Sequence, residues 1–306
     1  MRIALLGRTK TLIATGQILV ENGHEVVLIA TGRPSDEDQT SVNDFRTAAE
    51  RFNSVLLERV NLTQVRDELT RTAPEAGISI NYPVVLPSGI TGFPRLGILN
   101  AHGGDLPRYR GNACQAWAIL QGESRIAVCI HRMIADRVDE GDILSRRLYG
   151  VTENTKIGDV YKWMESVIPM MFLETLSKLE VDSGYILEKQ SDNPADSLRC
   201  FPRRPEDGRI DWSLSAVQIV RLINASGAPY AGAFGEFEGR RFTLEDAEIA
   251  INQTPYLAVP GQVLKIHKSC ITVACGEEAI RINKAWFTDD KSPLVQAVTT
   301  IRQRLS

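Results

Sequence analysis

The sequence predicts an α/β protein with a Rossmann-like, doubly wound and mostly parallel sheet, followed by a small, mostly β (OB-like) domain. Over the first half of the chain, short apolar stretches alternate with segments of helical periodicity, which is typical of a parallel sheet with helical crossovers. Residues 191–209 are rich in Pro, Asp and Arg and favour a linker. Beyond them, short strands alternate with turns. We therefore expect one domain over residues 1–202 and a second, which begins with a helix, over residues 203–306.

The individual elements follow from local patterns, in chain order. Apolar stretches predict strands over residues 2–7, 25–30, 54–60, 77–83, 96–102, 125–134 and 142–151. Helical spacing predicts helices over residues 9–22, 44–52, 63–72 and 113–122, and a longer one whose apolar stripe runs from Ile157 to Leu179. Gly23 should end the first helix, and Pro169 should kink the long one. In the second domain, a helix over residues 213–226 precedes the short strands.

Composition and charge exclude several classes of protein. The 306-residue chain carries a net charge of −3, which gives no sign of a surface for nucleic acid or anionic membranes. No stretch reaches the roughly 18 apolar residues of a membrane span, and the first residues do not resemble a signal peptide. The five cysteines lack the spacing of metal ligands, and the four histidines are scattered, so we expect no metal site. These features predict a cytoplasmic protein with reduced thiols and no membrane partner.

One stretch, LNAHGGDLPRYRG at residues 99–111, carries the clearest chemistry. Asn100 and His102 lie two residues apart, so they point to the same face of a strand, at the carboxyl end where doubly wound sheets bind ligands. An amide beside an imidazole can stabilise an oxyanion while a proton is transferred. Neither is a strong nucleophile here, so the attacking group should come from a second substrate held nearby. The structural alternative is an Asn–His pair that caps the end of the strand.

A carboxylate would complete this site by orienting the imidazole and favouring its protonated form. The charged loop ADRVDEGD offers Asp136, Asp139 and Asp142, and their spacing alone does not choose among them. His131 lies in the middle of an alternating strand and is interpreted as structural or surface-exposed. The turn GRTKT after the first strand lacks the GxGxxG pattern of dinucleotide sites, although Arg8 could contact a phosphate there.

The stretch resembles the signature of the formyltransferases that use 10-formyltetrahydrofolate. That family reads Asn-x-His-x-Ser-Leu-Leu-Pro, then Tyr-Arg-Gly, and further along Asp-x-Gly. Here the matching text is NAHGGDLPRYRG, followed by VDEGDIL. The resemblance continues through AWAILQGE, FPRRPEDGRIDWSLSAVQIVRLINAS, PYAGAF and PGQVL, so it covers nearly the whole chain. Within the family, which includes the methionyl-tRNA enzymes, the chain is closest in character to those that formylate nucleotide-linked amino sugars.

The resemblance implies a catalytic trio of Asn100, His102 and Asp139, because Asp139 is the aspartate of Asp-x-Gly. In the expected mechanism, Asn100 and protonated His102 stabilise the oxyanion of the attacked formyl group, and Asp139 raises the basicity of His102. The formyl donor would be 10-formyltetrahydrofolate, with no metal. The residues implied in folate binding are Tyr82, Gly104, Asp105, Leu106, Pro107, Ala135, Asp136, Arg137 and Val138. The sequence departs from the family where Ser-Leu-Leu-Pro becomes GDLP at residues 104–107.

Charge favours a nucleotide-linked amino sugar over tRNA as the acceptor. A tRNA-binding surface needs clustered Lys and Arg. Residues 201–306 hold 13 basic and 12 acidic residues, and the loop TGRPSDEDQTS has one Arg and three acids. A diphosphate needs only a few positive groups. The residues expected to bind the acceptor are Arg8, Thr9, Arg108, Arg110 and Asn112. By resemblance, Asn112 stands where the related amino-arabinose formyltransferase carries a second Arg.

Several alternatives accompany this interpretation. The acceptor could be a hydroxyornithine-type amine or methionyl-tRNA, or water could replace the amine in a formyltetrahydrofolate hydrolase. The chain could also be a folate or nucleotide-sugar binding module without catalysis, which the intact trio argues against. The second domain could contribute to a homodimer interface.

Overall fold

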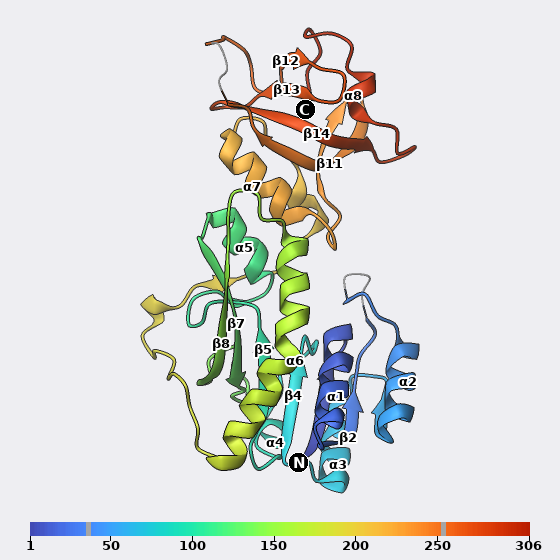
Figure 1. Cartoon of the computed structure of the whole chain (residues 1–306), viewed down its shortest axis with the longest axis vertical. Coiled ribbons are helices and arrows are strands. Elements are labelled where there is room, and N and C mark those ends of the chain that lie inside the picture. The colour runs from blue at the N-terminus through green and yellow to red at the C-terminus, as the bar shows by residue number, and fades with distance from the viewer. Residues whose placement is uncertain (35–37, 252–254) are drawn as a thin grey trace. The chain divides into compact units, whose positions relative to one another are not determined.

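The structure is a computed structural model that describes residues 1–34, 38–251 and 255–306 (Figure 1). Its residues fall into two compact units. The N-terminal unit comprises residues 1–114, 126–149 and 161–201, and the C-terminal unit comprises residues 115–125, 150–160 and 202–306. The C-terminal unit therefore contains two short segments of the expected first domain, in addition to the residues beyond 202.

The N-terminal unit is built on a seven-stranded sheet with the strand order β3-β2-β1-β4-β5-β7-β8. Its strands are β1 (Arg2–Gly7), β2 (Glu25–Ala30), β3 (Val55–Leu57), β4 (Ala76–Ile80), β5 (Ile98–His102), β7 (Arg125–Arg132) and β8 (Ile143–Gly150). Strands β1 to β5 pair in parallel, whereas β7 pairs with β5 in the antiparallel direction. The predicted Rossmann-like, doubly wound and mostly parallel sheet is thereby confirmed.

The helices of this half of the chain begin and end where local chemistry places them. They are α1 (Lys10–Glu21), α2 (Val42–Phe52), α3 (Leu62–Thr72), α4 (Ser88–Thr91), α5 (Cys114–Gln121) and α6 (Ile157–Val181). Ser41 caps α2 by accepting from the backbone N–H of Asp44, whose carboxylate accepts from the N–H of Ser41 in return. Asn61 caps α3 by accepting from the N–H of Gln64. Helix α6 continues through Pro169.

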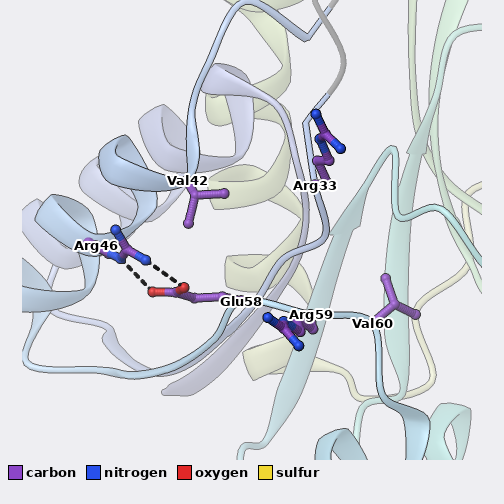
Figure 2. Close-up of a pocket in the computed structure, with 6 residues that line it drawn as sticks. All are labelled: Arg33, Val42, Arg46, Glu58, Arg59 and Val60. Atoms are coloured by element: carbon purple, nitrogen blue, oxygen red, sulfur yellow. Dashed lines mark hydrogen bonds and ion pairs between the residues drawn. The ribbon is translucent and has the colours of Figure 1, made fainter.

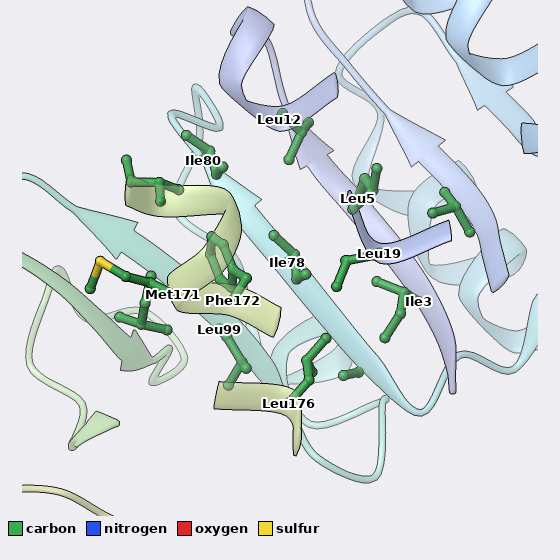
Figure 3. Close-up of a cluster of buried hydrophobic side chains, with 14 of the residues drawn as sticks. Ile3, Leu5, Leu12, Leu19, Ile78, Ile80, Leu99, Met171, Phe172 and Leu176 are labelled. Atoms are coloured by element: carbon green, nitrogen blue, oxygen red, sulfur yellow. The ribbon is translucent and has the colours of Figure 1, made fainter. Parts of the chain in front are cut away.

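Two apolar layers bury the two faces of the sheet. Because successive side chains of a strand point to opposite faces, Leu5 joins one layer and Leu6 the other. In the first layer, Phe172 of α6 lies over the strands, as Figure 3 shows. The other labelled members of this layer are Ile3, Leu5, Leu12, Leu19, Ile78, Ile80, Leu99, Met171 and Leu176. In the second layer, Val65 and Leu69 of α3 pack with Ile90 of α4. This burial explains why RIALLG reads as a continuous apolar run.

The turn after β1 requires a glycine for packing. Gly7 has a φ of +153°, and a Cβ there would lie 2.0 Å from the carbonyl oxygen of Ile80 on the neighbouring strand β4. Any other residue would force β1 and β4 apart, so the close approach of the backbone accounts for this glycine.

The segment expected to be a linker, residues 191–209, is instead paired with the N-terminal unit over part of its length. Its short strand β9 (Arg199–Cys200) pairs in parallel with β6 (Arg110–Gly111). The backbone N–H of Arg110 donates to Leu198 over 2.9 Å, and that of Asn112 donates to Cys200 over 3.1 Å. The sequence of this segment shows no alternation of apolar and polar residues that would predict a strand. Backbone hydrogen bonds to a loop distant in sequence nevertheless hold part of it in place.

The C-terminal unit carries a helix followed by an antiparallel sheet, as expected. Ser215 caps helix α7 (Ala216–Ser226) in a capping box with Gln218. The strands are β10 (Ala233–Phe237), β11 (Arg240–Ile249), β12 (Val263–Ile266), β13 (Ile271–Ala274) and β14 (Ala279–Phe287), in the order β10-β11-β14-β13-β12. A short helix, α8 (Leu294–Ala297), follows. Phe242 and Phe287 are fully buried in the core of this unit.

None of the helices within residues 1–34, 38–251 and 255–306 combines the length and the apolar character needed to cross a lipid bilayer.

The packing of α6 on the sheet predicts a large cost for removing Phe172. Its side chain is fully buried, so Phe172→Ala should lower the free energy of unfolding by about 3–5 kcal/mol. The matched control is Met170→Ala in the same helix, because Met170 is 45% exposed and should change stability by no more than about 0.5 kcal/mol. Urea unfolding measures both values, and equal effects would contradict this view of the core.

Candidate active site

Four side chains from two neighbouring strands and one turn meet at the carboxyl end of β5. His102 Nδ1 lies 3.4 Å from Asp139 Oδ2, and His131 Nε2 lies 3.3 Å from Asp139 Oδ1. Asn100 Nδ2 lies 3.1 Å from His131 Nε2. The structure therefore brings Asn100, His102 and Asp139 into one cluster, with His131 between the amide and the carboxylate.

The register of β5 against β7 creates this cluster. Asn100 pairs with His131 across the two antiparallel strands, and directly opposed residues of such a pair point to the same side. The interpretation of His131 as structural or surface-exposed is therefore incomplete, because its buried ring contacts both Asn100 and Asp139. The alternating pattern of its strand was visible in the sequence, but the register that sets it opposite Asn100 was not.

Asp139 is held from several sides in the turn between β7 and β8. Its Oδ2 accepts from the backbone N–H of Gly111 over 2.9 Å, and its own carbonyl accepts from Gln190 Nε2 over 2.8 Å. Asp136, by contrast, is exposed and donates its backbone N–H to the carbonyl of Leu86. Of the aspartates in this loop that spacing alone could not separate, Asp139, the one that the family resemblance implies, faces the histidines.

The environment of Asp139 favours its charged form. Burial alone would raise the pKa of this carboxyl, but the charge of His102, the hydrogen bond to His131 and the Gly111 N–H outweigh burial and hold the pKa well below its usual value. Asp139 is therefore an ionised carboxylate at neutral pH.

His102 responds to burial in the opposite sense. Burial lowers the pKa of the ring, and the raising effects of Asp139 and of the Tyr109 carbonyl do not offset it. Asp139 therefore raises the basicity of His102, as expected, but the desolvation of the fully buried ring outweighs this effect and favours the neutral form. His102 Nε2 lies 2.7 Å from the carbonyl oxygen of Tyr109. A carbonyl oxygen can only accept a hydrogen bond, so Nε2 carries the proton of the neutral ring. The nitrogen that faces Asp139, Nδ1, is then unprotonated.

Gly104 shapes the loop around His102. A Cβ at this position would lie 2.2 Å from the carbonyl oxygen of Tyr109 and 2.5 Å from His102 Nε2. The glycine that replaces the serine of the family signature is thus required for the contact between His102 and Tyr109.

The other residues of the loop at 104–107 are partly engaged within the protein. Arg146 binds the carboxylate of Asp105 and donates to the carbonyl of Leu106 over 2.8 Å. The Leu106 side chain is buried with Ala127 and Ile143. Pro107 follows, half-buried. The Asp105 and Leu106 side chains therefore have roles in the fold, which leaves mainly the backbone of this loop for a ligand.

The remaining residues expected near folate lie at two other places. The hydroxyl of Tyr82 is buried and has no hydrogen-bond partner among the described residues, and burial raises the pKa of Tyr82 to about 12. In the turn after β7, Asp136 and Arg137 are exposed, and Arg137 pairs with Glu140 over 3.1 Å. Ala135 and Val138 of the same turn are half-buried.

The residues expected to bind the acceptor are less closely grouped. Arg8 Nε pairs with Asp38 over 3.1 Å, at the end of β1, and the Thr9 hydroxyl beside it is buried without a partner in the described part of the chain. Arg108 lies over the ring of Tyr109, 5.2 Å from its centroid. Arg8 and Thr9 follow β1, whereas Arg108 lies in the loop after β5, two strand positions away in the sheet.

Arg110 and Asn112 lie in the loop that pairs with β9. Two nitrogens of Arg110, Nε and Nη2, donate to Oε1 of Gln190 over 3.2 and 2.8 Å. Asn112 is exposed and donates its backbone N–H to Cys200. Nothing in the sequence singled out Gln190, whose partners are 51 and 80 residues away.

A separate pocket of about 460 Å³ lies at the ends of β2 and β3, away from these residues in the sheet order. Figure 2 shows the residues that line it, among which Arg46 and Glu58 form a bidentate ion pair with N–O distances of 2.6 and 2.8 Å. Its other lining residues are Arg33, Val42, Arg59 and Val60. None of the residues expected from the sequence to form the active site lines it.

The histidines and carboxylate of the cluster do not form a metal site. Within the described ranges, no three or more His, Cys, Asp or Glu side chains are grouped so that they could hold a metal ion. The cluster is therefore best described as an amide, two imidazoles and a carboxylate joined by hydrogen bonds and charge.

Comparison with known families identifies the chain. Residues 1–176 match the formyl transferase family, and residues 203–297 match the formyl transferase C-terminal domain. The chain belongs to this family. Formyltransferases of this family are enzymes that use formyltetrahydrofolate as the formyl donor, so the donor and the reaction type expected from the sequence are confirmed.

Curated relatives cover most of this formyltransferase. A methionyl-tRNA formyltransferase of Geobacter sulfurreducens is 27% identical over 291 residues, which is 93% of this chain and 88% of the relative. One of Caldanaerobacter subterraneus subsp. tengcongensis is 30% identical, over 92% of this chain and 91% of the relative.

Solved structures share the fold at lower identity. WlaRD, a sugar 3N-formyltransferase crystallised with dTDP and 5-N-formyl-THF, superposes with a TM-score of 0.67 at 15% identity, over 95% of this chain and 98% of that chain. The N-formyltransferase of Helicobacter canadensis, in complex with folinic acid and dTDP-3-aminofucose, gives 0.69 at 12% identity, over 93% and 99%. A methionyl-tRNA formyltransferase of Clostridium thermocellum gives 0.57 at 16% identity, over 83% and 95%.

The electrostatics of the cluster predict the titration of His102. Its ring should titrate below the ordinary value of about 6.5, because burial disfavours its charged form. Asp139→Asn should lower the pKa further, since it removes the carboxylate charge that raises it. Histidine NMR measures both values, and a His102→Gln variant assigns the resonance. A His102 that titrates at or above its ordinary pKa would contradict this description.

Proposed function

We propose that this enzyme transfers the formyl group of 10-formyltetrahydrofolate to the amino group of a nucleotide-linked amino sugar. The observation that carries the proposal is the cluster in which Asn100, His102 and Asp139 meet at the carboxyl end of β5. Doubly wound sheets bind their ligands at this edge, and the chain belongs to a family of formyl-transferring enzymes.

Each member of the trio has a role that its environment supports. The amide of Asn100 would donate to the carbonyl oxygen on which negative charge develops. His102, neutral at rest with its proton on Nε2, would take at Nδ1, the nitrogen beside Asp139, the proton that the attacking amine loses. That proton would then pass to the nitrogen of the departing tetrahydrofolate. Asp139 would stabilise the imidazolium, because its carboxylate faces the ring at 3.4 Å. This assigns His102 as a base rather than as a proton donor from the start.

The folate, which supplies the formyl group, would bind between the loops around the trio. The buried hydroxyl of Tyr82, which has no partner among the described residues, offers one hydrogen bond to a ligand. The backbone of residues 104–107 and the turn at 135–138 would flank it. Because Arg146 holds Asp105, we expect this loop to contact the folate through backbone groups.

Charge supports a small acceptor. In the C-terminal unit, Arg240 pairs with Asp289 and Asp290 at 2.8 Å each. Likewise, Arg281 pairs with Glu248 and Lys156 with Asp246. These acids neutralise the basic side chains that would have to meet phosphates of tRNA. The loop after β2 is poor in basic residues as well, although Asp36 and Glu37 of that loop lie outside the described residues. Arg108 and Arg110 would then contact the diphosphate of the acceptor.

Methionyl-tRNA is the second candidate acceptor. The curated relatives that cover nearly the whole chain carry that name, at 24–30% identity. The solved structures do not separate the candidates, since enzymes named for sugars and for methionyl-tRNA share the fold. The charge pattern of this chain leads us to place the amino sugar first.

The acceptor can be identified by mass. Incubation with 10-formyltetrahydrofolate and a panel of dTDP- and UDP-linked amino sugars should yield one acceptor that gains a formyl group. Methionyl-tRNA, tested in parallel, should remain unmodified because the protein lacks the clustered Lys and Arg side chains that bind tRNA phosphates. Formylated methionyl-tRNA would overturn the assignment, and formate released without any formylated acceptor would indicate a hydrolase.

The trio can be tested against its neighbour in the same loop. Asn100→Ala should lower kcat by about 10²–10³, as the loss of an oxyanion donor does, and Asp139→Asn should lower it by at least about tenfold. Asp142→Asn is the matched control and should keep kcat within about twofold. Spectrophotometric detection of tetrahydrofolate measures all three. A larger effect at Asp142 than at Asp139 would refute the assignment of the carboxylate.

A further inference from the structure

Gln190 has a side-chain amide whose hydrogen-bonding capacity is completely used at the proposed active site. Its Nε2 donates to the carbonyl oxygens of Asp139 and Gly141, over 2.8 and 2.6 Å. Its Oε1 accepts from Nε and Nη2 of Arg110, over 3.2 and 2.8 Å. A primary amide has two N–H donors and two acceptor positions, so all four are satisfied.

These partners fix the orientation of the amide without ambiguity. Rotating the amide of Gln190 by 180° would aim its N–H groups at the guanidinium of Arg110 and its oxygen at two carbonyls. All four hydrogen bonds would then be lost. Because Gln190 is nearly completely buried, water cannot readily replace them, and an unpaired amide would be costly there.

The position of Gln190 in the chain explains how one side chain reaches both loops. The segment after α6 is drawn in yellow in Figure 1, and its Glu188 forms a bridge with Ile143 at the start of β8. Ten residues further, Leu198 accepts from the N–H of Arg110. Gln190 lies between these two anchors, so its backbone is fixed on either side.

We propose that Gln190 is a positioning residue for formyl transfer, which sets the carboxylate of Asp139 against His102 and ties that turn to Arg110. This inference rests on the proposed roles of the trio. Asp136 and Asp139 of this turn both adopt positive φ angles of 59°, a conformation that residues other than glycine rarely adopt unless neighbouring groups support it. The two hydrogen bonds from Gln190 to this turn hold it where the carboxylate can stabilise an imidazolium.

Two substitutions separate the two halves of this contact. Gln190→Met removes all four hydrogen bonds at similar size, whereas Gln190→Glu keeps the acceptor for Arg110 and loses the donors to Asp139 and Gly141. If the hydrogen bonds from Gln190 to the turn of Asp139 position the carboxylate, both variants should lower kcat at least about tenfold. The KM for 10-formyltetrahydrofolate should change less than about threefold. If only the contact with Arg110 mattered, Gln190→Glu would behave as the wild type, and the proposal would be overturned.

A double-mutant cycle and a titration test whether Gln190 acts through Asp139. In an Asp139→Asn background, Gln190→Met should cause little further loss of kcat, because the group it positions is already absent. An equal loss in both backgrounds would refute the proposal. By NMR, Gln190→Met should move the titration of His102 toward that of Asp139→Asn. The charged or titratable groups that act on His102 are Asp139, His131 and Arg199. This readout requires no acceptor, and an unchanged titration also counts against the proposal.

A matched control excludes a general loss of stability. Gln262 of the C-terminal unit also donates from its amide to two backbone carbonyls, those of Ile301 and Gln303. Gln262→Met removes a comparable pair of donated hydrogen bonds away from the trio, so it should leave kcat and the titration of His102 unchanged. If Gln190→Met does not fold, Gln190→Glu decides. Full activity of Asp139→Asn would refute the proposed trio, whereas an inactive Asp139→Asn with active Gln190 variants would refute this inference alone.

Discussion

The antiparallel pairing of β7 with β5 is the constraint on which the rest of the site depends. The pairings among β1 to β5 are all parallel, so these strands run in the same direction. By reversing direction, β7 sets His131 opposite Asn100, and the turn that follows brings Asp139 back to His102. A shift of one residue in this register would turn His131 to the other face of the sheet, and Asp139 would lose one of its two imidazole partners.

Burial then decides the charge of each group in the cluster. Bringing a carboxylate out of water is costly unless hydrogen bonds and opposite charges compensate. For Asp139 the hydrogen bonds from His131 and from the N–H of Gly111 compensate, together with the charge that His102 carries when it is protonated, and the carboxylate stays ionised. For His102 the compensation is insufficient, and the neutral ring is favoured. A neutral base beside a fixed negative charge is suited to accept a proton from an amine, because the ion pair formed is stabilised as it appears.

The loops around the cluster contain little regular secondary structure. Individual contacts between segments distant in sequence hold these loops in place. Gly104 permits the loop after β5 to fold back onto His102. Arg146 fixes Asp105 of that loop from strand β8, and Gln190 connects the turn of Asp139 to Arg110. The segment that carries Gln190 and β9 is thus part of the proposed active site, although its composition is that of a linker.

The sequence by itself determined the alternation of strands and helices, the mostly parallel sheet and the family, because apolar periodicity and the motif at residues 99–111 are local signals. It also determined that Asn100 and His102 share a face, since strand geometry requires it. Only the tertiary structure decided the parts that depend on contacts between distant segments. It set both histidines against the carboxylate of Asp139, which the Asp-x-Gly motif had already indicated, brought Gln190 to that turn, and lowered the pKa of His102 through burial. Strand register and desolvation are properties of the packed chain, so no local pattern could have revealed them.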